Sequence, residues 1–266
     1  MKRPVALYMV FIALLIFVFF LLNLLLGSVS IPFQEVWQIL WGNSHDNEIW
    51  YNIIWKSRIP QALTALVAGA GLSVSGLQMQ TVFRNPLAGP SVLGISSGAS
   101  MGVAFVVLLS GTLGGVALSK IGIMGEIALT LSAIIGSLSV MALIIFVSQK
   151  VKGNVTLLII GVMVGYVANA VIGVLKYFSV EEDIRAYVIW GLGSFARVSG
   201  NQMTLFVSIM LVLLPVSFLL VKTLNLLLLG DAYARNLGLN IKRARLQVIT
   251  CSGVLVAIVT AYCGPI

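Results

Sequence analysis

Charged residues are scarce in this chain. Asp, Glu, Lys and Arg make up 9% of its 266 residues, whereas a soluble globular domain carries roughly 25%. So few charges leave too little polar surface to face water, which excludes an ordinary water-soluble domain. Hydrophobic residues make up 59% of the chain, and the mean hydropathy is +1.08. We therefore predict an all-α transmembrane helix bundle, one domain over residues 1–266, because a helix satisfies its own backbone polar groups inside lipid.

Histidine and cysteine are also nearly absent. The single histidine, His45, lies in a polar stretch, and one histidine cannot build a metal site. Cys251 and Cys263 lie in one apolar stretch and are separated by about 18 Å along a helix, too far for a disulfide. No H-E-x-x-H or CxxC string occurs. We therefore expect no metal, no cofactor and no catalytic residues.

A phosphate-binding loop is missing as well. The sequence contains no G-x-x-x-x-G-K-[ST] string, in which backbone N–H groups and a lysine hold the phosphates of a nucleotide. If the chain takes part in ATP-driven work, the ATPase must therefore be another polypeptide.

Seven stretches have the length and apolar character of membrane-spanning helices, which need about 20 residues. They are Val5–Leu26, Ala62–Phe83, Val92–Leu109, Ile127–Val147, Val155–Phe178, Met203–Val221 and Val248–Cys263. The first is longer than the apolar region of a signal peptide, roughly 7–15 residues, and lacks an A-x-A site, so we expect an uncleaved helix.

Charges are unevenly divided between the segments that join these spans. With the N-terminus in the cytoplasm, the cytoplasmic segments hold ten basic residues and one acid, Asp231. The outer segments hold six basic residues and seven acids, so the two sides account for +9 and −1 of the net charge of +8. This asymmetry fits the positive-inside rule, and it explains the basic balance without a nucleic-acid partner.

The first outer segment, about residues 27–60, is rich in aromatic side chains. It contains Trp37, Trp41, Trp50, Tyr51 and Trp55. Because Trp and Tyr favour the membrane–water interface, we expect a short amphipathic helix lying along it.

Small and polar residues inside the spans indicate contacts between helices. Ala65, Gly69, Ser73 and Gly76 fall on one helical face, and small side chains let helices approach closely in lipid. We predict a tight helix interface along that face. Asn169 is the deepest polar residue of the fifth span. An interhelical hydrogen bond is favoured for it over a place on a transport pathway.

The long inner segment contains a short helix signal. Asp231 is a good N-cap and Gly238 a good C′ residue. We therefore predict a helix between them, with Ala232, Ala234 and Leu237 as a compact contact surface.

Several strings of the sequence together resemble the FecCD family, the permeases of type II ABC importers for siderophores, haem and vitamin B12. They are Arg58-x-Pro60, Arg84-Asn85-Pro86-Leu87-Ala88, Leu93-Gly94-Ile95, Leu157–Gly161, Tyr187–Phe195, Leu229–Gly238 and Gly264-Pro265-Ile266. The resemblance implies an inner-membrane permease that imports an iron-siderophore, haem or cobalamin. It implies three partners: a separate ABC ATPase, a periplasmic substrate-binding protein and a second permease copy. The family has ten spans, whereas we count seven here, so the three C-terminal spans of the family pattern are missing and the chain resembles a truncated member.

The resemblance also implies roles for particular residues. The cytoplasmic gate is matched by Asn85, Leu87, Asn154 and Val155. The sequence alone favours a plain connector for the turn that holds Asn85 and Leu87, and a helix N-cap is the alternative for Asn154. The helix that docks on the ATPase is matched by Asp231, Ala232, Ala234, Arg235, Leu237 and Gly238. Arg58 matches an arginine that docks the substrate-binding protein. Gln61 stands where the family often has a second arginine, and Lys56 is the candidate to replace it.

Other classes of membrane protein remain as alternatives. A secondary transporter would need intramembrane acids or a proton relay, which are not evident, and a membrane enzyme would need more than one histidine. A non-transporting scaffold stays open because only seven of ten spans are present.

Overall fold

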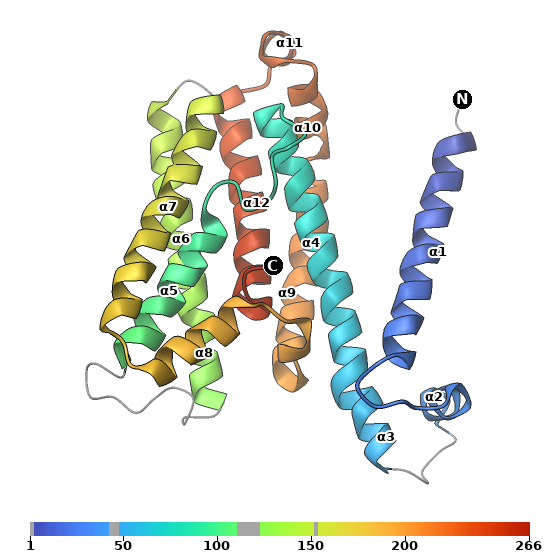
Figure 1. The fold of residues 1–266 in the computed structure, drawn as a ribbon. Helices are drawn as coiled ribbons and strands as arrows, with labels where there is room; N and C mark the ends of the chain where they lie inside the picture. Colours follow the sequence, from blue (N-terminus) through green and yellow to red (C-terminus); the bar gives the residue numbers. More distant parts are fainter. Residues whose placement is uncertain (1–2, 43–47, 111–122, 152–153) are drawn as a thin grey trace. The chain divides into compact units, whose positions relative to one another are not determined.

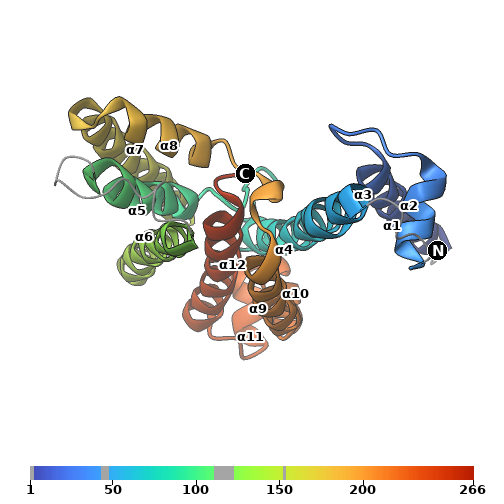
Figure 2. The same ribbon diagram turned by 90° about the horizontal axis from the view of Figure 1, so that it is seen from below.

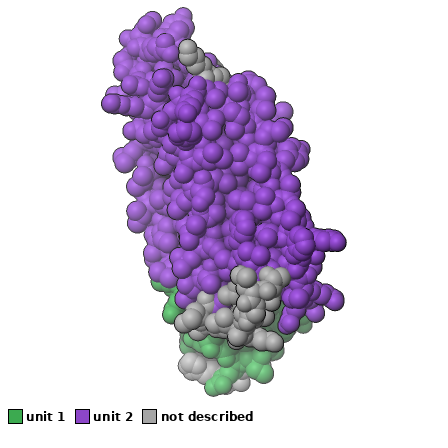
Figure 3. Space-filling view, turned by 90° about the vertical axis from the view of Figure 1, so that its left-hand side faces the viewer, with its two compact units in different colours: residues 1–66, 195–204 green, residues 67–194, 205–266 purple. Residues whose placement is uncertain are grey.

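The computed structural model describes residues 3–42, 48–110, 123–151 and 154–266. Within these ranges all regular secondary structure is helical (Figure 1), which confirms the predicted all-α fold. His45 lies outside the described residues. The chain divides into two compact units, residues 1–66 with 195–204 and residues 67–194 with 205–266 (Figure 3).

The helices follow one another along the whole described chain. In order they are α1 (Arg3–Leu25), α2 (Phe33–Leu40), α3 (Glu48–Ile53), a π-helical turn (Ile54–Arg58), α4 (Ile59–Phe83), α5 (Ile95–Ser110), α6 (Ile123–Lys150), α7 (Asn154–Phe178), α8 (Glu181–Gly191), a 3-10 turn (Phe195–Arg197), α9 (Gly200–Phe218), α10 (Val221–Leu228), α11 (Asp231–Asn236) and α12 (Ile241–Cys263).

All seven predicted spans fall on helices of this series. Among the described residues, six helical runs are long and apolar enough to cross a membrane, and α5 is a shorter apolar helix over Ile95–Leu109. The predicted third span therefore starts too early. Gly94 has a positive φ of +72°, a left-handed conformation that interrupts a right-handed helix, and α5 begins directly after it.

The first unit contains α1, α2, α3 and the start of α4. In α1, residues 5–19 are all exposed, as expected for a helix that is apolar on every side and faces lipid. Helix α2 is amphipathic, because Val36 and Ile39 are buried while Trp37 and Trp41 are exposed. The rings of Trp37 and Trp41 lie 5.8 Å apart. The aromatic segment thus forms the short amphipathic helix predicted for it.

The second unit is built around α5, α6, α7 and α12 (Figure 2). Helix α5 packs against α6 and α7, and α12 packs against α6 and α5. A Cβ added at Gly102 of α5 would collide with the Ser132 carbonyl oxygen of α6, and one at Gly136 of α6 would collide with the Gly98 carbonyl oxygen of α5. The two backbones therefore touch through small residues four apart, the pattern that lets membrane helices pack closely.

Within one copy of the chain, the middle of the predicted α4 interface meets no other described helix. A Cβ at Gly69 would meet no atom within 4 Å, and Ser73 is exposed. Helix α4 instead packs through a neighbouring face. There Gly71 contacts α9 and α12, and the Ser75 hydroxyl lies 2.5 Å from the Ser252 hydroxyl of α12. Both faces of α4 carry small residues, so composition does not tell which one meets a neighbour.

Candidate functional site

The C-terminal end of α4, the loop of residues 84–90, α10 and α11 lie at one end of the second unit (Figure 1, top). Helix α4 ends with Arg84 in the left-handed region, at a φ of +49°. The backbone N–H of Asn85 donates to the Gln80 carbonyl oxygen at 3.2 Å. This six-to-one bond is the mark of a Schellman end. A residue with a side chain costs roughly 1–2 kcal/mol in that conformation, so the chain holds Arg84 there at a cost.

The 84–90 loop is fixed by its own hydrogen bonds. The Asn85 side-chain oxygen accepts from the Leu87 N–H at 2.9 Å, and the Gln80 amide donates to the Pro86 carbonyl oxygen at 3.0 Å. Ala88 is buried, whereas Leu87 is 87% exposed. The two predicted gate residues of this loop therefore have different parts: Asn85 shapes the turn and Leu87 is its exposed tip.

Helix α11 is set between two glycines with positive φ, Gly230 at +102° and Gly238 at +86°. The Leu239 N–H donates to the Ala234 carbonyl oxygen at 2.9 Å, so Gly238 has the C′ position predicted for it. The predicted N-cap role of Asp231 is wrong. Gly230 is the N-cap residue, no side chain caps the helix, and Asp231 is the first helical residue.

The Asp231 carboxylate binds two arginines instead of the helix backbone. One oxygen lies 2.5 Å from the Arg84 guanidinium and the other 2.6 Å from that of Arg245. Both contacts are charge-assisted hydrogen bonds between an ionised donor and an ionised acceptor, and they use both oxygens of the carboxylate. The three partly exposed side chains connect the 84–90 loop, α11 and the first turns of α12.

One side of α11 is buried and the other is open. Ala234 belongs to the buried core cluster of the second unit, so it cannot be part of the predicted contact surface. Leu237 is exposed, as are Ala232 and Arg235. Sequence reasoning missed Tyr233, which is 70% exposed. The four-residue spacing of Tyr233 and Leu237 places both on one helical face and was the signal that could have identified it.

The other predicted gate residues lie at the start of α7. The helix begins at Asn154, whose side chain lies outside the described residues, and Val155 is exposed. Two residues further on, Leu157 belongs to the same buried cluster as Ala88. The start of α7 and the 84–90 loop therefore share one core.

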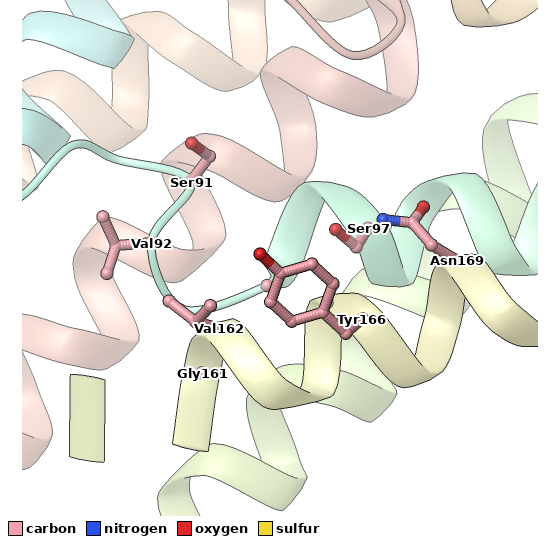
Figure 4. A pocket seen from close by; sticks show the side chains of 9 residues that line it. Ser91, Val92, Ser97, Gly161, Val162, Tyr166 and Asn169 are labelled. Carbon is pink, nitrogen blue, oxygen red and sulfur yellow. The ribbon is translucent and has the colours of Figure 1, made fainter. Parts of the chain in front are cut away.

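A small cavity of about 170 Å³ lies between α7 and the chain around the start of α5 (Figure 4). It is lined by Ser91, Val92, Gly94, Ser97, Gly161, Val162, Gly165, Tyr166 and Asn169. The sequence favoured an interhelical hydrogen bond for Asn169, but its side chain is exposed and lines this cavity. A Cβ at Gly161 would lie 2.7 Å from the Val92 carbonyl oxygen. The glycine thus lets the two chain segments meet at the cavity.

Arg58, predicted to dock a binding protein, is 5% exposed. Its guanidinium donates to the carbonyl oxygens of Leu24 at 2.6 Å and Leu25 at 3.0 Å, and also to that of Val29. These are the unpaired carbonyls at and after the end of α1. A guanidinium bound in this way is not available to an acid on another protein, whereas Lys56, the second residue predicted for docking, is exposed.

Two of the strings noted in the sequence, Tyr187–Phe195 and Gly264-Pro265-Ile266, meet in space. The Ser194 N–H donates to the Cys263 carbonyl oxygen at 2.8 Å, and a Cβ at Gly193 would lie 2.9 Å from the Pro265 carbonyl oxygen. In α8, burial raises the pKa of the Tyr187 phenol. The Lys176 ammonium lies 4.9 Å from the centre of the same ring. This end of the unit is therefore closely packed.

Comparison with known proteins gives the same picture over almost the whole chain. The family model of the FecCD transport family matches residues 14–266. The hemin transport system permease protein HmuU of Yersinia pestis is 32% identical over 91% of this chain and 69% of its own length. The vitamin B12 import system permease protein BtuC of Serratia proteamaculans is 35% identical over 89% of this chain and 67% of its own length.

The fold is similar to that of a solved transporter. A structure described as an inward-facing conformation of an ABC transporter of the metal-chelate type has a TM-score of 0.79 and 29% sequence identity, and the match covers 99% of this chain and 77% of that one. Sequence, span pattern and fold therefore agree, and this chain belongs to the FecCD transport family, as a multi-pass permease of the ABC importer type.

Proposed function

We propose that this chain is the membrane permease, one transmembrane domain over residues 1–266, of a binding-protein-dependent importer that moves a metal chelate across the inner membrane. The candidate substrates are an iron-siderophore, haem and a cobalamin. The observation that carries the proposal is α11, a six-residue helix with an open apolar face, placed beside the 84–90 loop. The relatives named for hemin and vitamin B12 support the substrate class.

The open face of α11 is suited to docking on a separate ATPase. Tyr233 and Leu237 are 70% and 61% exposed, which provides a small apolar knob for a groove on a partner. Arg235 and Lys242 are exposed near it, and the acid of the helix, Asp231, is already bound by two arginines. The proposed partner therefore offers an apolar socket with acidic residues at its rim.

A second copy of the permease completes the proposed pathway. The cavity beside Tyr166 and Asn169 holds about 170 Å³, whereas pockets for drug-sized ligands span about 300–1,000 Å³. This cavity can therefore hold only part of a haem or cobalamin, and two copies facing each other enclose the rest. In this arrangement Leu87 and Val155, both exposed, close the cytoplasmic mouth, and Asn169 faces the ligand.

The distribution of charges supports an orientation for the chain in the membrane. The N-terminus, the 84–90 loop and α11 face the cytoplasm, where basic residues are retained and where ATP is available. Lys56, in the run that leads into α4, then lies on the outer side, where a binding protein delivers ligand. A secondary transporter is the weaker alternative, because the acids of the described spans, such as Glu126 in the first turn of α6, lie at helix ends rather than in the middle of a span.

The ATPase partnership is tested by purification. The chain with an affinity tag, extracted in mild detergent from membranes of cells that also express its candidate ATPase, should bring with it ATP hydrolysis that orthovanadate inhibits. Tyr233→Asp with Leu237→Asp should lower this activity at least tenfold, because a charged knob cannot fill an apolar socket.

The matched control is Tyr177→Asp with Phe178→Asp, which places the same two charges at exposed aromatic residues at the far end of α7 and should keep the activity. Loss of the activity in both variants would mean that a new charge anywhere disrupts the complex. Equal activity in both would remove α11 as the docking site.

A further inference from the structure

We infer that Asp231 transmits movement of α11, the proposed docking helix, to the 84–90 loop, which holds the gate residue Leu87. The transmission runs through the bond of Asp231 to Arg84. Asp231 is in this view a positioning residue: the ATPase moves α11, and the carboxylate carries Arg84 and the following turn with it. The inference rests on the proposed function and adds to it the physical connection between the ATPase surface and Leu87.

The first support is how the carboxylate is shared. Each of its two oxygens is used by a different arginine, at 2.5 Å for Arg84 and 2.6 Å for Arg245. Arg245 lies in α12, which is largely buried, so that bond has a fixed support. Arg84 lies at the base of the loop. The bond to Arg245 therefore sets the resting position of the Asp231 carboxylate and has to break when α11 moves, whereas the bond to Arg84 carries the loop.

The second support is the strained position of Arg84. Among the described non-glycine residues, Arg84 is the one with a positive φ, at a helix end where glycine or asparagine is usual. The same residue reaches across 147 positions of sequence to Asp231. Strained residues persist where the surrounding structure holds them, and the two-arginine bridge supplies that hold.

The third support is the short path from Arg84 to the exposed tip of the loop. Asn85 follows directly, and its side chain accepts the Leu87 N–H at 2.9 Å. The Gln80 amide also holds the Pro86 carbonyl oxygen. Because this loop is internally bonded, a shift of Arg84 moves the turn as one piece instead of being absorbed by a flexible chain.

The experiment follows the gate directly in the purified complex with the ATPase. Leu87→Cys is labelled with a membrane-impermeant maleimide, without nucleotide and with ATP plus orthovanadate, and the two labelling rates are compared. Labelling is read on the band of this chain, where the background is low because Cys263 is buried and Cys251 is half-buried. In the variant that carries only Leu87→Cys, the labelling rate should differ at least threefold between the two nucleotide states.

Substitutions at Arg84, added to Leu87→Cys, then test whether the Asp231–Arg84 bond transmits movement or only stabilises the fold. With Arg84→Gln the nucleotide-dependent change should fall below 1.5-fold, whereas Arg84→Lys, which keeps the charge, should retain most of it. Asp231→Asn should resemble Arg84→Gln, and the double variant should be no worse than either. Lys222→Gln, which removes an exposed cation of α10 outside the bridge, should behave like the parent.

The outcomes distinguish a failure of the proposed coupling to the ATPase from a failure of the Asp231–Arg84 link. An unchanged rate in Leu87→Cys alone, with the ATPase bound, would contradict the proposed coupling as a whole and the link with it. A normal nucleotide response in Arg84→Gln would overturn only the link. Losses in the double variant that multiply the single losses would show that Arg84 and Asp231 act separately, which also overturns it.

Discussion

Helices α11 and α12 are neighbours in the chain but are held in place by different forces. About two thirds of α12 is buried, and its contacts involve small and polar residues such as Ser252, Gly253 and Thr260. In α11 only Ala234 is buried, and the helix is defined by two glycines of positive φ and by the Asp231 ion pairs. Packing therefore holds α12 in place, whereas glycine caps and ion pairs hold α11, the helix that is proposed to move.

The largest expected effect is on the packing of α12. A Cβ at Gly253 would lie 2.7 Å from the Met141 sulfur and 3.0 Å from Ile95 Cδ1, so Gly253→Leu overpacks the core. Overpacking costs about 1–3 kcal/mol, occasionally more. The thermal unfolding midpoint in detergent should drop by several degrees. Gly69→Leu, at a position with no atom within 4 Å, should leave the midpoint nearly unchanged. Equal drops in the midpoint for the two variants would show that packing around Gly253 does not hold α12 in place.

A smaller and strictly local effect is expected at the C-terminal end of α11. Gly238 has a φ of +86°, and alanine in the left-handed region costs roughly 1–2 kcal/mol. In Gly238→Ala, hydrogen exchange of the amides of residues 234–239 should quicken about fivefold or more while the midpoint of the bundle stays in place. Gly191→Ala is the matched control, since that glycine ends α8 without a positive φ. Slower or unchanged exchange in Gly238→Ala would show that the glycine conformation does not limit this helix.

The smallest effect is expected at the hydroxyl pair between α4 and α12. The Ser75 and Ser252 hydroxyl oxygens lie 2.5 Å apart, and hydrogen bonds of this kind in membrane proteins average about 0.6 kcal/mol. A double-mutant cycle with Ser75→Ala and Ser252→Ala should give a coupling free energy near that value. A coupling free energy of zero would mean that the close approach reflects packing alone.

The scaffold could be predicted from the sequence to a large extent, because lipid selects long apolar helices whatever their neighbours are. The predicted spans Val5–Leu26 and Val155–Phe178 coincide with helical runs within one residue at their ends. Gly238 was predictable for the same reason, since a C′ glycine depends on local backbone geometry. Which face of α4 meets another helix was not predictable, because Gly69 and Gly71 are equally small and only the arrangement of α9 and α12 decides.

The candidate functional residues Asp231 and Arg58 were less predictable, because their hydrogen bonds join parts of the chain that lie far apart in the sequence. Asp231 looks like an N-cap in isolation, and only the fold brings Arg84, 147 positions away, to its carboxylate. Likewise Arg58 is basic and near a predicted membrane surface, yet the end of α1 takes up its guanidinium. Local sequence identifies a side chain that can form an ion pair or a cap, but not which distant group will compete for it.

ATP-driven uptake tests the central claim most directly. Vesicles that hold this chain, its ATPase and enclosed ATP, with the substrate-binding protein outside, should accumulate haem, a ferric siderophore or cobalamin at least tenfold above vesicles without ATP. Uptake should require the binding protein and should ignore the proton gradient. Accumulation that follows a proton gradient without ATP, or none of these ligands taken up by a fully assembled complex, would contradict the account.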